Sequence, residues 1–342
     1  MTVAGPAAEN AELASISPPS TPGQRRKKIA TGEGRLALYL VAPTIALLGV
    51  IVGYPIVKAI IASFQTDGTG KIDPTTGLFA KGGDFAGLDN YKHWLLQRCT
   101  GAGGKGVSCP PGNLGAEFWD SLRVTLFFTV VSVSIEAVIG MLMALMMHKA
   151  FKGRGLVRAA ILIPWAIPTA VTAKLWAVVF DPQGILNKVL GTHFLWTSDK
   201  WPARFAIIIA DVWKTTPFIA LLILAGLQSI PDELYESARV DGASAWQRFV
   251  RITLPLVKPA LAVALIFRTL DVLRMFDLPW ILTGGANGTS TLSILVVRQL
   301  TQGANSAAAL STITFLFIFG IAFIMVRLLS ANLVGAQTKG VK

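Results

Sequence analysis

Two sets of closely spaced charged residues, six residues in all, interrupt long apolar stretches of this sequence, and their types and spacing suit the binding of a polar solute. Two of them lie three positions apart in one stretch, and four more follow each other at intervals of three in a later stretch. They are Asp211 and Lys214, then Arg268, Asp271, Arg274 and Asp277. Carboxylate and guanidinium groups form hydrogen bonds with hydroxyl groups. The same charges could instead pair with one another, because oppositely charged neighbours three apart meet along a helix, and the sequence leaves both interpretations open.

Aromatic side chains beside these charges favour a sugar as the solute. Trp213, Phe218 and Trp280 offer flat apolar faces, which can stack on the apolar faces of pyranose rings. Three of the six charges are basic and three are acidic, so the set is neutral as a whole. An anionic solute such as a phosphate ester would favour an excess of positive charge. The balance therefore argues for a neutral sugar.

Sequence signatures of covalent catalysis and of cofactor binding are missing. The glycine-rich stretches 68–71 and 103–106 lack both the leading Gly and the Ser or Thr after Lys that a phosphate loop requires. No hydrolase or zinc-peptidase motif occurs, and the three histidines are dispersed, at His93, His148 and His193. We predict no catalytic residue, no metal site and no cofactor in this chain.

The elements that must position these residues are membrane-spanning helices. Hydrophobic residues make up 53% of the 342 residues, charged residues only 15%, and the mean hydropathy is +0.57. Average soluble domains are roughly a quarter charged, and a spanning helix needs about 20 apolar residues. Because backbone groups in lipid must be satisfied within their own segment, the sequence predicts an all-α, polytopic membrane protein. Its six transmembrane helices are expected near residues 36–63, 122–147, 156–180, 205–227, 259–282 and 307–329.

The net charge of +12 is assigned to cytoplasmic loops rather than to nucleic-acid binding. Lys and Arg are enriched in the cytoplasmic loops of membrane proteins. Here they gather before the first span, after the second and after the fourth. Both termini are therefore predicted to lie on the cytoplasmic side of the inner membrane. Residues 1–30 are expected to form a disordered tail, residues 31–335 the membrane domain, and residues 336–342 a second tail.

The loop at residues 64–120 lies on the opposite side and contains both cysteines, Cys99 and Cys109. The outer compartment is oxidising, and the spacing of the two cysteines could close a small disulfide ring. Two free thiols are the alternative. Structural zinc takes four ligands, and only His93 is nearby, so no metal site is predicted in this loop.

The cytoplasmic loop at residues 230–258 is predicted to fold as two short helices. Pro231 suits a first helical position, and Gly242 suits the left-handed conformation that ends a helix. A second helix follows, with Trp246 and Phe249 at helical spacing, and Pro255 is expected to end it. An ordinary interfacial helix pair is the alternative interpretation.

The residues of this loop resemble the EAA loop of ABC importer permeases. Glu236-Ser-Ala, Gly242 and Ile252-Thr-Leu-Pro stand at the spacing of that motif. Ser237 replaces the Ala of the family pattern with another small residue. In that family the loop forms the coupling helices that dock into a cleft of a separate ATPase subunit. The resemblance assigns ATPase coupling to Glu236, Ser237, Ala238, Asp241, Gly242, Ile252, Leu254 and Pro255.

The resemblance runs from about residue 36 to residue 329 and is closest to the maltose-type sugar permeases. The strings that carry it are 162–168 (LIPWAIP), 211–218 (DVWKTTPF), 267–277 (FRTLDVLRMFD) and 282–285 (LTGG). The second and third strings are most similar to the first permease of actinobacterial trehalose importers. Where maltose permeases tend to carry Asn in the third string, this chain has charged or apolar residues. That departure favours a sugar other than maltose.

The resemblance implies a type I ABC importer permease fold and a role as half of a heterodimeric pore. It implies a second permease subunit, two ATP-binding subunits that hold ATP and Mg, and an extracytoplasmic solute-binding lipoprotein. It also implies that the solute is a disaccharide, with trehalose as the preferred candidate. The positions expected to bind the solute are Asp211, Lys214, Thr215, Phe218, Arg268, Asp271, Val272, Arg274, Met275 and Asp277.

Other functions stay open as alternatives. The same class of importer could carry maltose, another oligosaccharide or glycerol phosphate. An ion-coupled secondary transporter would show inverted internal repeats, none of which is evident, and it would leave the EAA-like loop unexplained. A membrane-embedded enzyme would need a catalytic constellation that the sequence lacks.

Overall fold

A computed structural model of the protein describes residues 33–68, 83–100 and 106–339. The chain separates into two units, residues 1–58 and residues 59–342, and each is described by itself. The tail expected at residues 1–30 lies outside the described residues.

The first predicted span is a helix with one widened turn. Helix α3 (Glu33–Leu48) leads through a π-helical turn (Gly49–Gly53) into α4 (Tyr54–Ala62). The N–H group of Tyr54 bonds to the carbonyl of Gly49, five residues back. Proline has no N–H group, and its ring clashes with the carbonyl four residues back. A π-helical turn directly before Pro55 therefore lets the helix continue.

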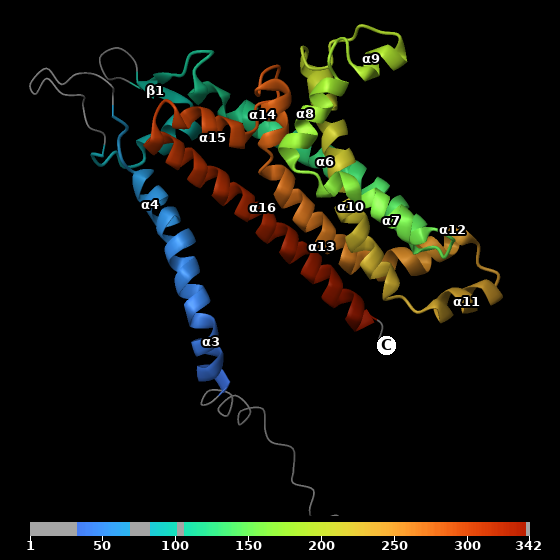
Figure 1. Cartoon of the computed structure of the whole chain (residues 1–342). Helices are drawn as coiled ribbons and strands as arrows, with labels where there is room; N and C mark the ends of the chain where they lie inside the picture. The colour runs from blue at the N-terminus through green and yellow to red at the C-terminus, as the bar shows by residue number, and fades with distance from the viewer. Residues whose placement is uncertain (1–32, 69–82, 101–105, 340–342) are drawn as a thin grey trace, which may run out of the picture. The chain divides into compact units, whose positions relative to one another are not determined.

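Three long helices form the centre of the second unit. They are α6 (Phe118–His148), α10 (Lys200–Gln228) and α13 (Leu254–Leu273), each packed against the other two, and α16 (Ala304–Lys339) lies along α13 (Figure 1). A Cβ atom at Gly140 of α6 would lie 2.8 Å from Ile219 of α10, so glycine permits the close approach of these helices. One cluster of side chains buried between the three helices is apolar and includes Met147, Ile219, Ile223, Leu227, Val257 and Ala264.

Among the described residues, five helices are long and apolar enough to cross a membrane, and the number is six if a bent pair of helices is counted as one span. The five are Leu36–Ala62, Leu114–His148, Lys200–Gln228, Ala245–Leu273 and Ala304–Leu328. The predicted all-α, polytopic fold is therefore confirmed.

The bent pair stands where the third span was predicted, at residues 156–180. Helices α7 (Arg154–Ala166) and α8 (Thr169–Val179) differ in direction by 92°. Ile167, between them, is extended with ψ of 132°. A residue before proline is driven out of the helical region by the proline ring, so Pro168 explains why a continuous helix does not form here.

The fifth span lies closer to the N-terminus than the prediction of 259–282. A short helix, α12 (Ala245–Arg248), and a π-helical turn (Phe249–Thr253) run without a break into α13. The expectation that Pro255 ends a separate helix is wrong, because the widened turn before it accommodates the proline: the N–H group of Leu254 bonds to the carbonyl of Phe249.

The other end of α13 corrects a second expectation. The helix stops at Leu273, and α14 begins a new helix at Asp277 (Asp277–Thr283). The four charges spaced at intervals of three therefore do not lie on one continuous helix. Arg268 and Asp271 belong to α13, Arg274 lies in the break, and Asp277 begins α14.

Different elements lie at the two ends of the second unit (Figure 1). One end carries α11 (Asp232–Val240) and α12. The opposite end carries α9 (Ile185–Leu190), α14 and the strand β1 (Arg98–Thr100), which pairs antiparallel with β2 (Gly106–Ser108). The remaining elements are α5 (Asp89–Leu95), a 3-10 helix (Leu114–Glu117) and α15 (Leu292–Leu300).

Hydrogen bonds tie the 64–120 segment to the start of α16. The indole N–H of the buried Trp94 donates to the carbonyl of Ser306 at 3.0 Å. The carboxylate of Asp67 accepts the backbone N–H groups of Asn305 at 2.6 Å and of Ser306 at 2.9 Å. A carboxylate at a helix N-terminus satisfies free N–H groups and is favoured by the helix dipole.

Candidate functional site

Four charged side chains meet where α6, α10 and α13 pack together. Arg268 of α13 contacts Glu136 of α6, Asp211 of α10 and Asp271, one turn further along its own helix. The Arg268 side chain is 3% exposed and that of Glu136 is 0% exposed, whereas that of Asp271 is 64% exposed. A buried charge is tolerated in an apolar interior only when it is paired and hydrogen-bonded. The cluster therefore meets both needs within the bundle and presents one carboxylate outward.

The Arg268 guanidinium is the centre of this cluster. It binds Glu136 through two parallel hydrogen bonds, from Nε to Oε2 at 2.6 Å and from Nη2 to Oε1 at 3.0 Å. Nη2 also donates to Asp211 and Nη1 donates to Asp271. Paired bonds between guanidinium and carboxylate fix both planes. The Thr215 hydroxyl, 2.8 Å from Oε1 of Glu136, adds a further partner for that carboxylate.

Lys214 of α10 is held by the break between α7 and α8. Its Nζ atom donates to the carbonyl of Ile167 at 2.8 Å and lies 3.5 Å from the carbonyl of Trp165. Both carbonyls lie at the end of α7, where the helix stops before Pro168. The last carbonyls of a helix lack partners within the helix and attract cations. Lys214 thus joins the bent pair to the central bundle.

A cavity of about 490 Å³ opens beside these charges. Eight of the ten residues predicted to bind the solute line it: Asp211, Lys214, Thr215, Arg268, Asp271, Arg274, Met275 and Asp277. Two predicted residues do not. Val272 is buried in an apolar cluster with Phe128 and Leu278, because helix periodicity turns it away from Asp271. Phe218 lies behind Trp165, and the two rings stack with centroids 5.7 Å apart.

The aromatic lining of the cavity differs from the prediction. Trp165 and Phe276 line it, whereas Trp213, Phe218 and Trp280 are not among its lining residues. Phe276 stacks on Trp280 with centroids 5.6 Å apart, so each lining ring is supported by a second ring behind it. Thr169 and Leu278 also line the cavity and were missed. Both follow chain breaks, at Pro168 and at residues 274–276, whose course the sequence pattern did not reveal.

Glu136 is the main residue that sequence reasoning left out of the site. It is an isolated acidic residue in a long apolar helix, and such a residue usually faces a cavity or a partner. That signal was present in the sequence. Its partner could not be read, since Arg268 lies 132 residues further along the chain.

The predicted coupling residues lie in two groups on either side of α12: one on α11 and in the turn after it, the other in the π-helical turn and at the start of α13. Helix α11 ends in a Schellman arrangement: the N–H of Ala243 bonds to the carbonyl of Ala238, and that of Gly242 to the carbonyl of Arg239. Gly242 has φ of +75°, a left-handed conformation that glycine adopts without strain. Ser244 then caps α12 by a reciprocal pair of bonds with Gln247.

This loop is anchored on one face and exposed on the other. The Tyr235 hydroxyl lies 3.0 Å from Oγ1 of Thr253, and Phe249 packs against the apolar core. Val240 is 87% exposed and Trp246 is 71% exposed. Of the predicted coupling residues, Glu236, Ser237, Asp241, Gly242 and Pro255 are exposed, whereas Ala238, Ile252 and Leu254 are half-buried.

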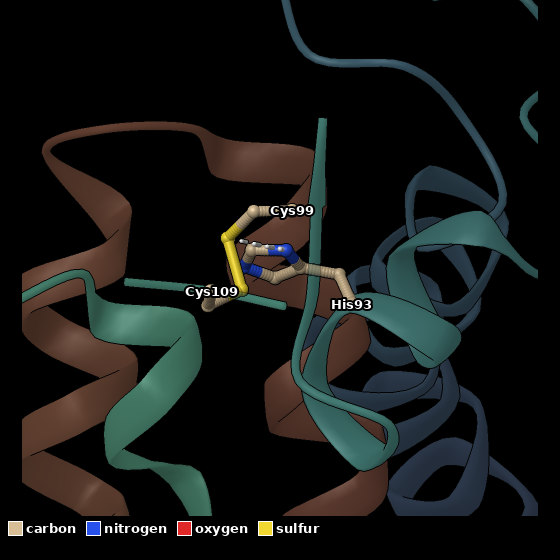
Figure 2. A group of neighbouring side chains, drawn as sticks. All are labelled: His93, Cys99 and Cys109. Carbon is tan, nitrogen blue, oxygen red and sulfur yellow. Dashed lines mark hydrogen bonds between the residues drawn. A yellow bond between two sulfur atoms is a disulfide. The ribbon is translucent and has the colours of Figure 1, made fainter. Parts of the chain in front are cut away.

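Cys99 and Cys109 form a disulfide that closes the β1–β2 hairpin (Figure 2). The His93 ring lies against it, with Nδ1 2.8 Å from the carbonyl of Arg98. These three side chains are close enough to share a metal ion, but the sulfurs are bonded to each other and are not free thiolates, which metal binding requires. In this structure the disulfide therefore serves to hold the two strands of the hairpin together.

Comparison with known proteins agrees with this architecture. Residues 136–335 match the family described as binding-protein-dependent transport system inner membrane component. The chain is 40% identical to the trehalose transport system permease protein SugA of Mycobacterium tuberculosis, over 90% of this chain and 93% of that protein. It is 38% identical to the trehalose/maltose transport system permease protein MalF of Thermococcus litoralis, over 88% and 95% of the two chains.

A solved structure shares the fold at low sequence identity. It is a bacterial ABC transporter involved in the import of the acidic polysaccharide alginate, whose matched chain superposes with a TM-score of 0.67 at 23% identity. The match covers 90% of this chain and 98% of that chain. Together, the bundle of membrane helices, the loop formed by α11 and α12 and the similarity to these relatives over nearly their whole length show that the chain belongs to the binding-protein-dependent transport system inner membrane component family, the permease subunits of ABC importers.

Proposed function

We propose that this chain is one permease subunit of an ATP-driven importer that carries a neutral disaccharide across the cytoplasmic membrane by alternating access. Trehalose is the disaccharide that we propose as its solute. The observation that carries the proposal is the cavity of about 490 Å³ lined by paired charges and by stacked aromatic rings. Pockets for small molecules span about 300–1,000 Å³, so a disaccharide is of suitable size. Relatives named for trehalose transport support this choice of sugar.

The charge of the cavity supports a neutral solute. Its lining contains three basic and three acidic residues, and Glu136 adds a further acidic group directly behind Arg268. An anion such as glycerol phosphate would have to approach the exposed carboxylate of Asp271 without an excess of positive charge to offset the repulsion. These charges can both pair with one another and bind a solute. Arg268 is buried and paired with three carboxylates, and one of them, that of Asp271, is also exposed to the cavity.

The exposed face of α11 and α12 supports docking of a separate ATPase subunit. Exposed apolar side chains such as Val240 and Trp246 are typical of protein interfaces. Two ATPase copies would bind ATP and Mg²⁺, and their closure would move this loop together with α13, with which α12 is continuous. The proposed assembly also contains a second permease subunit and an extracytoplasmic solute-binding lipoprotein.

The orientation in the membrane is part of the proposal. The α11–α12 loop and the strand β1 lie at opposite ends of the second unit (Figure 1). The basic residues around the loop favour the cytoplasmic side for it. Both termini would then be cytoplasmic, and the Cys99–Cys109 disulfide would lie in the outer, oxidising compartment.

The test is uptake by vesicles that contain this chain with its second permease, ATPase and binding-protein partners. We expect ATP-dependent uptake of radiolabelled trehalose, with less maltose and no glycerol phosphate. Uptake that follows an ion gradient without ATP would show a secondary transporter instead. Preferred uptake of glycerol phosphate would overturn the proposal of a neutral sugar.

A further inference from the structure

We propose that Glu136 is a positioning residue for solute recognition: through Arg268 it fixes the direction in which Asp271 faces the cavity. This inference rests on the proposed function and assigns a role to a residue that does not itself line the cavity. Glu136 lies on α6, whereas the charges that line the cavity lie on α10, on α13, in the break after α13 and at the start of α14.

Glu136 and Arg268 form a two-bond pair with a fixed geometry. Both carboxylate oxygens of Glu136 accept from one edge of the guanidinium, the Nε and Nη2 edge, at 2.6 and 3.0 Å. A guanidinium is planar, and its five N–H groups point in fixed directions. Once that edge is bound by a carboxylate that is 0% exposed, the direction of Nη1 is also fixed.

The Nη1 atom of Arg268 connects the buried pair to the cavity. It donates to Oδ2 of Asp271, whose side chain is 64% exposed and lines the cavity. Asp271 thereby lies on the other side of Arg268 from Glu136, and no hydrogen bond or ion pair joins the two carboxylates among the described residues. Glu136 therefore touches the cavity lining at two points, Arg268 and the Thr215 hydroxyl, and of these two Arg268 is the one that bonds to Asp271.

Glu136 is not needed to neutralise the charge of Arg268. Asp211 alone would supply a buried negative partner for Arg268. Adding Glu136 gives three acidic groups around one guanidinium, so net neutrality does not require it. Its distinct contribution is the two-bond fork, which sets the orientation of the guanidinium plane.

A double-mutant cycle tests this role on the purified complex without its binding protein. Trehalose dissociation constants are measured for the wild type, for Glu136→Gln, for Asp271→Asn and for the double variant. Glutamine keeps the shape of Glu136 but cannot accept from Nε and Nη2 together. We expect Glu136→Gln to raise the Kd about tenfold, which corresponds to about 1.4 kcal/mol. In the Asp271→Asn background the same change should alter the Kd by less than about twofold, because coupled residues are not additive.

Additive effects in the cycle would overturn the inference, because a residue that acts only on stability affects both backgrounds alike. An unchanged Kd for Glu136→Gln would also overturn the inference.

If the Glu136→Gln variant fails to assemble, Glu136→Asp replaces it in the cycle, since aspartate keeps the carboxylate but withdraws it by one methylene. Asp120→Asn is the matched control, because it removes an exposed acidic partner of Arg123 outside the cavity and should leave the Kd unchanged. A wild-type complex that binds none of the sugars would instead refute the proposed function itself.

Discussion

The ammonium group of Lys214 donates a hydrogen bond to the carbonyl of Ile167 at 2.8 Å, so a charge from the middle of α10 occupies the break in the neighbouring bent pair. The break arises from Pro168, which leaves the last carbonyls of α7 without helical partners. A lysine placed there satisfies them and also finds a site for its own buried charge. The same contact locates the wall of the cavity, because Trp165 and Thr169 flank the break and line the cavity.

Replacing Lys214 with methionine is predicted to destabilise the bent pair. The variant keeps the aliphatic stem but leaves the carbonyl of Ile167 without its donor, and hydrogen bonds to charged groups contribute about 1.5–3 kcal/mol. Thermal unfolding of the purified complex should shift to lower temperature, and amide exchange at residues 169–172 should speed up. Lys174→Met is the control, since Lys174 of α8 is exposed. Equal melting temperatures for the two variants would contradict a structural role for the Lys214 contact.

Replacing Gly242 with alanine is predicted to uncouple sugar binding from ATP hydrolysis. A Cβ atom at this position meets no other atom within 4 Å, so the cost comes only from the left-handed φ of +75°. That conformation costs roughly 1–2 kcal/mol for an L-residue, enough to shift the turn between α11 and α12. Sugar-stimulated ATPase activity should fall severalfold, while the trehalose Kd of the complex stays unchanged.

Gly191→Ala provides the matched control for this variant. Gly191 ends α9 with φ of +65° and also has open space around it, but it lies at the other end of the second unit. It should carry a similar backbone strain without loss of ATPase stimulation. If both variants lose stimulation equally, general destabilisation rather than the coupling turn would explain the result.

Removing the Cys99–Cys109 disulfide is predicted to loosen the hairpin locally. The bridge spans a sequence separation of 10 residues, and closing a ring of this size stabilises by roughly 2–3 kcal/mol in the chain-entropy description. In the double variant Cys99→Ser with Cys109→Ser, amide exchange should rise in β1 and β2 but not in the central helices. The wild type should resist alkylation until it is reduced. Ready alkylation without reductant would show that the two thiols are free.

The parts of this structure that follow from local sequence were the predictable ones. Apolar stretches of suitable length predicted the spans, and Gly242 predicted the end of α11, because a helix end depends on residues within one turn. The two π-helical turns were not expected, although each directly precedes an X-Pro pair, at Pro55 and Pro255. Periodicity alone predicts either an ended or a continued helix there, and packing decides between them.

The tertiary partners of the site could not be predicted in the same way. The spacing of Arg268 and Asp271 indicated their pairing along one helix. It could not indicate that Arg268 also binds Glu136 and Asp211, since those contacts depend on how three separate helices pack. Aromatic residues near the charges were likewise assigned from proximity in sequence. Which ring of each stacked pair faces the cavity depends on the bend at Pro168 and on the break after Leu273.

Trp165 is predicted to contribute more to sugar affinity than Trp213, although both are tryptophans on neighbouring helices. Trp165 lines the polar cavity and is backed by the Phe218 ring. Trp213 instead lines a separate, apolar pocket and packs edge-on against Trp176. Aromatic contacts contribute about 0.5–1.5 kcal/mol beyond area burial, so Trp165→Ala should weaken trehalose binding about tenfold. Trp213→Ala should leave the Kd within about twofold of the wild type, since it offers the sugar no surface. Calorimetric titration of the purified complex measures both. A larger loss for Trp213→Ala would place the sugar on the opposite face of α10, contradicting both the aromatic assignment and the cavity as the binding site.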